Sequence, residues 1–512
     1  MFSKVSSAVI SGVESRMISV EADVSDGLPG FYMVGYLSSE VKEAQDRVRT
    51  AIRNSGLSML PKKITVNLAP ADLRKSGSGF DLPIAAAVLA SMGYIPAEEL
   101  KQYFIAGELG LDGRIHGIRG VLGMVLEART AGMKYCIVPE ANIQEASVVN
   151  DIEVYGASHL KEIMEHFTTA EKLKKRHINI EEIVSDTADI QYSEKITADF
   201  ADVKGQHFVK RAAEIAAAGM HNLLITGPPG AGKSMIASRI PGILPPLSVD
   251  EVLEITKIHS IAGLLPESGI MRSRPFRMPH HTVTTAALTG GGAIPKPGEI
   301  SLAHRGVLYL DELPEFQKET LEILRQPMED GVVRISRNSG QFVFPAEFML
   351  IASRNPCKCG YYPDRSRCRC NEQEVLRYLN RISRPLLDRI DLHAEAYQMT
   401  YEDLQTSDKK EESSAQIRMR VLEAHRIQKI RYEGSEFRYN ADLNASALET
   451  YCAVGEEGKK LLQQVYEKKK LTARSYHRML KVARTIADLE GSEQIRTEHI
   501  GEAVQYRMSE YL

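Results

Sequence analysis

The chain lacks a strong excess of charge of either sign, a long apolar run and more than a few cysteines. Its 64 lysine and arginine residues nearly balance its 67 aspartate and glutamate residues. The resulting net charge of −3 gives no overall electrostatic reason to bind nucleic acid. Any such binding must therefore depend on a local surface.

The sequence also lacks a segment with the pattern of a membrane span or a secretory signal. The longest apolar run, 82–97, is shorter than the ~20 residues that a span needs, and it contains Pro83 and Pro96. No long apolar core precedes Glu14, which excludes the usual signal pattern. We therefore expect a cytoplasmic protein with no membrane partner.

The length and composition of the chain are those of a large folded protein. The 512 residues, 43% of them hydrophobic, correspond to about three domains. Residues 1–166 alternate strand-like segments, such as 18–24, with helix-like segments, such as 82–92, and a polar linker is expected over 167–199. Residues 200–395 have the strand, glycine-rich turn and helix of a nucleotide-binding α/β domain, and residues 415–512 have only helical patterns.

A phosphate-binding loop follows the short apolar strand expected at 221–226. Its sequence fits G-x-x-x-x-G-K-[ST] between a strand and a helix, which is the setting that this motif requires. Backbone N–H groups would surround the phosphates, Lys233 would add a positive charge, and the Ser234 hydroxyl would ligate Mg²⁺. The expected ATP contacts are Gly227, Pro228, Pro229, Gly230, Ala231, Gly232, Lys233 and Ser234.

Two later strands end in polar residues suited to hydrolysis of the γ-phosphate. Asp311 and Glu312 follow the strand expected at 306–310. We expect Asp311 to hold Mg²⁺ and Glu312 to polarise the attacking water. Asn355 follows the strand expected at 348–352 and would orient that water.

An arginine further along the chain could serve a neighbouring subunit. Arg389 lies in the segment Arg384-Pro-Leu-Leu-Asp-Arg-Ile-Asp391. It is expected either to reach a neighbour's γ-phosphate in trans or to form a plain surface ion pair with an adjacent aspartate.

Four of the six cysteines lie within fourteen positions, at Cys357, Cys359, Cys368 and Cys370. Four thiolates are enough for a closed tetrahedral Zn²⁺ site. The alternatives are a reduced cysteine-rich loop and another metal or redox use. We expect a structural zinc clip with no catalytic role.

The order of these motifs resembles that of the AAA+ ATPases, and within them the helix-2-insert clade of the magnesium chelatase ATPase subunit and the MCM helicases. The segment 202–206 resembles the clade's adenine-contacting segment, and the helix containing Leu471-Thr-Ala-Arg474 resembles the one that carries its sensor-2 arginine. This resemblance implies that role for Arg474.

Phrases along nearly the whole chain, among them GFDLPIA, DFADVKGQ, RPFRMPHHT and GEISLAHRGVLYLDELPEF, resemble the ComM/YifB family. The resemblance implies a hexameric, ATP-driven motor that moves branched DNA junctions during recombination of incoming DNA. The alternative is a magnesium-chelatase-type ATPase that drives a partner protein without DNA. The first domain and the cysteine quartet disfavour this alternative, because the resemblance implies that the chelatase subunit lacks the first domain.

Residues 1–166 resemble the Lon-protease and RadA C-terminal domain. The Lon serine position falls on Gly79 and the Lon lysine position on Leu122, so nucleophile and base are both missing. We expect a non-proteolytic domain, although a gap in this alignment would bring Ser76 or Ser78 to the nucleophile position.

Two basic regions are candidates for contact with DNA. In the clade, inserts between the phosphate loop and the acidic pair form hairpins that face the central channel, which would bring Arg277 and Lys296 near the nucleic-acid backbone. Residues 459–484 hold nine lysines and arginines and the single acid Glu467. This stretch is expected to be either a DNA-facing surface or a solvated helix face.

Overall fold

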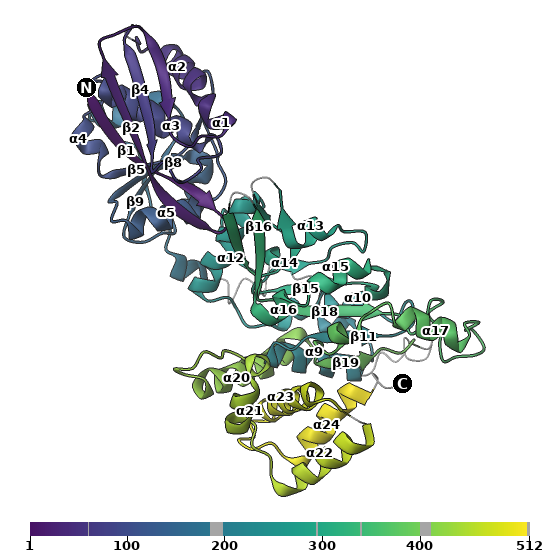
Figure 1. Ribbon diagram of the computed structural model, residues 1–512. Helices are drawn as coiled ribbons and strands as arrows, with labels where there is room; N and C mark the ends of the chain where they lie inside the picture. Colours follow the sequence, from purple (N-terminus) through teal and green to yellow (C-terminus); the bar gives the residue numbers. More distant parts are fainter. Residues whose placement is uncertain are drawn as a thin grey trace.

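The computed structural model describes residues 1–59, 61–184, 198–292, 295–337, 340–399, 411–469 and 471–508. One α/β domain lies at one end, a second lies in the middle and a helical domain lies at the other end (Figure 1). The predicted α/β class, parallel sheet and C-terminal helices are confirmed. Within the described ranges, no helix is both long and apolar enough to cross a membrane.

The first domain is built on an eight-stranded mixed sheet with the order β10-β9-β8-β5-β1-β2-β4-β3. The strand predicted at 18–24 lies within β2. The strands of the sheet are β1 (Phe2–Ser11), β2 (Glu14–Ser25), β3 (Gly30–Val34), β4 (Lys63–Ala69), β5 (Tyr103–Ile105), β8 (Tyr135–Pro139), β9 (Glu153–Ala157) and β10 (Lys175–Arg176).

Helices cover both faces of this sheet. Helix α3 (Asp81–Ser91) is buried along its whole length on the face of Val9, while α5 (Val121–Thr130) packs on the face of Ala8. Helix α5 begins at Val121, directly after Gly120, which adopts a left-handed conformation with φ +74. The other helices are α1 (Ser39–Lys42), α2 (Ala44–Asn54), α4 (Ala97–Leu100), α6 (Ile143–Ala146) and α7 (Leu160–Thr168).

The first sheet continues beyond residue 166, inside the expected linker. β10 pairs antiparallel with β9 and forms one edge of the sheet. Ile180 is also buried, in the core around α5. Residues 185–197 of the expected linker lie outside the described residues.

The second domain contains a five-stranded sheet in the order β12-β15-β18-β11-β19, and all neighbouring strands are parallel. Three of its strands match the predictions at 221–226, 306–310 and 348–352. The strands are β11 (Leu223–Thr226), β12 (Phe276–Arg277), β15 (Val307–Leu310), β18 (Met349–Arg354) and β19 (Leu392–Glu395).

Helices and two short hairpins surround this sheet. The hairpins pair β13 (Gly290–Gly291) with β14 (Lys296–Pro297) and β16 (Val332–Arg337) with β17 (Gly340–Pro345). The helices are α9 (His207–Gly219), α10 (Lys233–Ala237), α11 (Ile240–Ile243), α12 (Val249–Ala262), α13 (Thr285–Thr289), α14 (Glu299–Leu302), α15 (Lys318–Ile323), α16 (Pro327–Asp330), α17 (Glu372–Leu379) and α18 (Arg384–Leu387).

The C-terminal helices share a hydrophobic core with the second domain. α9 packs between the sheet and the C-terminal helices, so that Ile215, Val421 and Ile486 belong to one buried cluster. The helices are α20 (Ser414–Arg431), α21 (Ala445–Tyr451), α22 (Glu456–Lys469), α23 (Ala473–Leu489) and α24 (Thr497–Met508). All five were predicted from the sequence.

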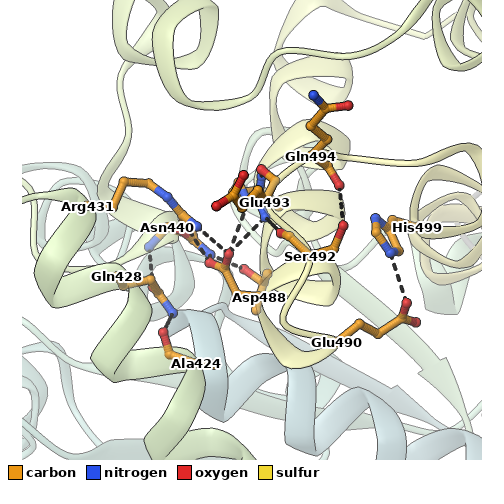
Figure 2. Close-up of polar contacts among 12 residues, drawn as sticks. Ala424, Gln428, Arg431, Asn440, Asp488, Glu490, Ser492, Glu493, Gln494 and His499 are labelled. Carbon is orange, nitrogen blue, oxygen red and sulfur yellow. Dashed lines mark hydrogen bonds and ion pairs between the residues drawn. The ribbon is translucent and has the colours of Figure 1, made fainter.

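A buried carboxylate connects the C-terminal helices. Asp488 on α23 accepts hydrogen bonds from Arg431 at 2.8 Å, Asn440 at 2.9 Å and Arg484 at 3.1 Å. Figure 2 shows Arg431 and Asn440 pointing toward Asp488, with Gln428 next to Asn440. The network joins α20, α23 and the turn that follows α20, and both of its arginines contact the Asp488 carboxylate.

A second buried carboxylate joins the first domain to the second. Glu145, only 3% exposed, accepts a hydrogen bond from the Ser260 hydroxyl on α12. The backbone N–H of Gly120 donates to the same hydroxyl at 2.9 Å. Burial raises the pKa of Glu145, while its bonds to Ser260, Asn142 and Leu122 oppose that rise. The contact fixes the first domain to α12.

Replacing Asp488 by alanine is expected to lower the free energy of unfolding of the C-terminal helices by about 3–5 kcal/mol, because the buried Arg484 and the partly buried Arg431 lose their partner. The measurement is hydrogen exchange in α20 and α23 across a urea series. The control is Glu423→Ala, which breaks an exposed pair with Arg426 on α20 and should cost no more than about 1 kcal/mol. Equal exchange in the two variants would contradict the role of Asp488.

Candidate nucleotide-binding site

The three strands that carry the predicted site end at the same edge of the sheet. In the parallel register Thr226 of β11 lies opposite Arg354 of β18, and Leu310 of β15 lies opposite Ala352. The residues that follow these strands therefore lie together, as ligand sites in open α/β sheets do.

The phosphate loop leaves β11 with an open inner surface. Gly230 and Gly232 have φ values of +78 and +79, and no atom lies within 4 Å of the position that a Cβ would take on either. Gly227 is constrained differently, because a Cβ there would lie 2.5 Å from the carbonyl oxygen of Ala396. Only glycine fits these positions, so the loop can follow the outline of a bound phosphate.

Lys233 lies within hydrogen-bonding distance of the loop and of the neighbouring strand end. Its Nζ donates to the carbonyl oxygens of Gly227 at 2.7 Å and Pro228 at 3.0 Å, and to Oδ1 of Asn355 at 3.0 Å. Burial lowers the pKa of Lys233, and the charges of Asp311 and Glu312 oppose this. The structure thus places Lys233, Asn355 and the acidic pair at one site.

Asp311 is oriented by hydroxyl groups. Its Oδ1 accepts hydrogen bonds from Tyr309 at 2.8 Å and from the Ser353 hydroxyl. The backbone N–H of Glu312 donates to Ser353 Oγ at 3.1 Å, and Glu312 has a left-handed φ of +51 with an exposed side chain. This conformation turns Glu312 away from the strand direction, as expected of a constrained functional residue.

Sequence reasoning missed Ser353. Its position at the end of β18, two residues before Asn355, is the signal that could have identified it.

The segment expected to contact adenine adjoins the phosphate loop. The Gln206 side chain donates to the carbonyl oxygens of Tyr397 at 2.6 Å and Ala231 at 3.3 Å. Asp202 caps a short turn and pairs with Arg239 at 2.9 Å. The 202–206 segment, the phosphate loop and residues 396–397 therefore lie next to one another.

Arg389 and Arg474 belong to a different cluster, and they share one carboxylate. Arg389 is 6% exposed; its guanidinium donates to Glu329 and, at 2.7 Å, to the Pro385 carbonyl oxygen. Arg474 lies 3.8 Å from the same Glu329 oxygen. Both line a polar cavity of about 890 Å³ between the second domain and the C-terminal helices. In the described chain, Arg389 therefore pairs with Glu329 rather than with Asp388 or Asp391.

The four clustered cysteines converge. Their ligand atoms all lie within 4.8 Å of one another, with Sγ–Sγ distances of 3.3 Å for Cys357–Cys359, 3.6 Å for Cys359–Cys368 and 3.8 Å for Cys357–Cys368. A tetrahedral metal with bonds of ~2.3 Å to sulfur requires edges of about 3.8 Å. The Tyr362 N–H also points at Cys357 Sγ, 3.4 Å away. The four thiols therefore fit a metal ion.

The basic regions are arranged differently from the expectation. Arg277 lies in β12 of the central sheet, and Glu299 binds it at 2.7 and 2.8 Å, so it is not a free hairpin residue. Lys296 is exposed on β14. Arg334 and Arg337, which sequence reasoning missed, lie on the nearby hairpin strand β16, and Arg337 approaches Gly291.

The basic stretch 459–484 does not form one surface. Arg478 pairs with Asp391 at 2.9 Å, Lys481 donates to the Ala441 carbonyl oxygen at 2.7 Å, and Arg484 belongs to the Asp488 network. These three cations hold the C-terminal helices in place. Lys470 lies outside the described residues.

The Lon serine position holds Gly79 and the Lon lysine position holds Leu122, so neither position supplies a nucleophile or a base. Leu122 is fully buried, and the Ser78 hydroxyl donates to Glu108. Lys75 is also buried, and its Nζ donates to the Pro70 carbonyl oxygen.

Family models of the magnesium chelatase match most of the chain. The model "Magnesium chelatase, subunit ChlI" matches residues 199–404, "Subunit ChlI of Mg-chelatase" matches 20–142, and "Magnesium chelatase, subunit ChlI C-terminal" matches 411–507.

Individual proteins are similar over almost their full length. "Competence protein ComM" of Haemophilus influenzae and "Uncharacterized protein YifB" of Salmonella typhimurium are each 44% identical over 496 residues, covering 97% of this chain and 95% of each relative. The "Magnesium-chelatase 67 kDa subunit" of Chlorobaculum parvum is 28% identical over only 31% of this chain and 23% of its own length.

Proposed function

Because this chain belongs to the ComM/YifB family of magnesium-chelatase-like AAA+ ATPases, we propose that it is a Mg²⁺-dependent cytoplasmic ATPase that forms a ring, a hexamer by family resemblance, and moves branched DNA. The convergence of Lys233, Asp311 and Asn355 at one sheet edge carries the ATPase part. Full-length similarity to a competence protein supports a role in recombination of incoming DNA.

The site residues divide the work of hydrolysis. Lys233 would exchange the carbonyl oxygens of Gly227 and Pro228 for phosphate oxygens of ATP. Ser234 and Asp311 would hold Mg²⁺, which neutralises phosphate charge when bound. Glu312 would polarise the attacking water and Asn355 would orient it.

Arg389 and Arg474 would act on the nucleotide of a neighbouring subunit. They share Glu329, whereas Lys233 and Asn355 contact each other. An arginine side chain binds the oxygens of a carboxylate and the oxygens of a phosphate in the same bidentate geometry. Arrival of a neighbour's phosphate would therefore draw the two guanidinium groups from Glu329.

DNA would contact the two adjacent hairpins. Lys296 on β14 and Arg337 on β16 are exposed, and the would-be Cβ of Gly291 lies 3.4 Å from Arg337, so the hairpins lie side by side. Positive charges presented this way bind the phosphate backbone without sequence preference and with strong salt dependence.

The alternative is an ATPase that drives a partner protein, as the chelatase name of the matching models suggests. The first domain does not disfavour it, contrary to the sequence expectation, because a model described as a chelatase subunit also matches residues 20–142. The extent of similarity favours the DNA motor, since the chelatase relative covers 31% of the chain and ComM covers 97%.

The four cysteines would bind one structural Zn²⁺. The Sγ spacing fits a tetrahedral ion, and soft thiolate ligands favour zinc among the available divalent metals. None of the four belongs to the set of residues assigned to hydrolysis.

Glu312→Gln is expected to retain ATP binding and ring assembly while steady-state turnover falls by about 10²-fold or more, because the water loses its base. Phosphate release and nucleotide affinity are the measurements. Glu315→Gln, three residues away in an exposed pair with Arg381, is the matched control and should keep turnover. Retained turnover in Glu312→Gln would eliminate the base assignment.

When Arg389→Ala chains are mixed with wild-type chains, activity should fall by more than the fraction of mutant chains in the mixture. Each mutant chain would disable its neighbour's site, where a trans arginine contributes about 10³–10⁵ in rate. Glu329 is about half exposed, so water can solvate it after the change. Mixtures with Arg381→Ala, an exposed arginine, should simply average. Averaging for Arg389→Ala as well would contradict action in trans.

The ATPase rate should rise with single-stranded and four-way-junction DNA, and this stimulation should fall as salt increases. Lys296→Ala combined with Arg337→Ala should lose stimulation and keep the basal rate, while Lys101→Ala, exposed on the first domain, should change neither. Absence of stimulation and of DNA binding at low salt would favour the partner-driving ATPase.

A further inference from the structure

The segment from Cys357 to Cys370, called the cysteine knuckle below, lies against the nucleotide site. It begins two residues after Asn355 and ends just before α17, whose N-cap is Asn371. Figure 1 shows α17 on the same side of the second domain as α10, the helix that follows the phosphate loop. The knuckle is therefore continuous in the chain with the residue that binds Lys233.

Gly360, at the turn of the knuckle, contacts the phosphate loop directly. Its N–H donates to the Cys357 carbonyl oxygen at 3.0 Å, and its φ of +88 is left-handed. A Cβ on Gly360 would lie 2.4 Å from Cδ and 2.7 Å from Cγ of Pro229. No side chain fits there while Pro229 keeps its place.

The outer edge of the knuckle contacts a third segment next to the phosphate loop, residues 397–398. Arg367 stacks over Tyr361 with 3.9 Å to the ring centre and donates to the Gln398 side chain. Gln398 follows Tyr397, whose carbonyl oxygen accepts from Gln206. The knuckle thus touches the phosphate loop and the strand end, and it is linked to the segment expected to contact adenine.

The knuckle has little apolar material of its own to hold this shape. Its buried cluster contains Cys357, Cys368 and Val375, with two tyrosines, two further cysteines and Leu379 partly buried around them. A segment this short cannot form a stable core, so metal binding would supply most of its folding free energy.

We propose that the metal-loaded cysteine knuckle is a positioning element of the nucleotide site, which holds Pro229 and Asn355 in the arrangement that binds ATP. Loss of the metal would release Gly360 from Pro229 and weaken nucleotide binding, although no metal ligand touches the nucleotide. The inference rests on the proposed nucleotide and zinc sites and adds that the second controls the first.

The test uses the full-length chain and measures zinc content per chain and the dissociation constant of a fluorescent ATP analogue. Gly360→Ala keeps all four thiols and places a methyl group against Pro229. We expect zinc to be retained and nucleotide binding to weaken by about tenfold or more. Pro229→Ala removes the two ring atoms that this methyl group would meet. The affinity of the double variant Gly360→Ala with Pro229→Ala should therefore be close to that of Pro229→Ala alone.

The matched control is Gly434→Ala. Gly434 has a similar left-handed φ of +76, and no atom lies within 4 Å of its Cβ position, so this variant carries the backbone strain without the collision. It should match the wild type in zinc content and affinity. A double variant, Cys368→Ser with Cys370→Ser, should lose zinc and show the affinity loss of Gly360→Ala while the helical circular dichroism signal is kept.

Wild-type affinity in Gly360→Ala, or in the folded zinc-free double variant, would overturn the inference. So would an affinity loss that Pro229→Ala does not relieve, or a wild-type chain that contains no metal. A wild-type chain that binds the analogue in this knuckle-dependent way and never hydrolyses ATP would instead contradict the proposed function and leave the inference standing.

Discussion

The parallel register of β11, β18 and β15 is the constraint on which the rest of the site depends. It sets Thr226 opposite Arg354 and Leu310 opposite Ala352. The phosphate loop, Asn355 and the acidic pair are far apart in the chain, yet each needs only to follow its strand to arrive at the same edge. Ser353 then orients Asp311, and Lys233 closes the group by binding Asn355. A shift of one residue in β18 would separate all of these contacts.

A second, smaller constraint fixes Arg389 and Arg474, the two arginines that we propose to act in trans. Asp391, two residues after Arg389, pairs with Arg478, four residues after Arg474. Burial acts to raise the pKa of Asp391, but Arg478, His221 and Lys481 together more than offset it, so the pKa is lowered and the carboxylate stays ionised. Arg507 also donates to the Ile390 carbonyl oxygen at 2.6 Å. These contacts join α23 and α24 to the segment around Arg389 and so set the position of Arg474 relative to Arg389.

Local patterns predicted most of the fold and the centre of the site. The phosphate loop and the Asp311-Glu312 pair carry their chemistry in consecutive residues, so the sequence alone could place them. Long-range pairing was beyond that reasoning. Arg389 binds Glu329, sixty positions away, and Arg277 of β12 binds Glu299 of α14. The stretch 459–484 is basic by composition, yet Arg478 and Arg484 are paired with Asp391 and Asp488 inside the protein. A count of charges cannot reveal which of them face solvent.

The buried Glu145–Ser260 contact joins the first domain to helix α12 of the second domain. Ser260 lies near the end of α12, which the chain forms between the phosphate loop and β15. The first domain extends away from this point (Figure 1). Any movement of α12 would therefore be transmitted to the first domain through this contact, and it would displace the far end of that domain most, because displacement grows with distance from the pivot. This single contact would therefore couple the orientation of the whole first domain to that of α12.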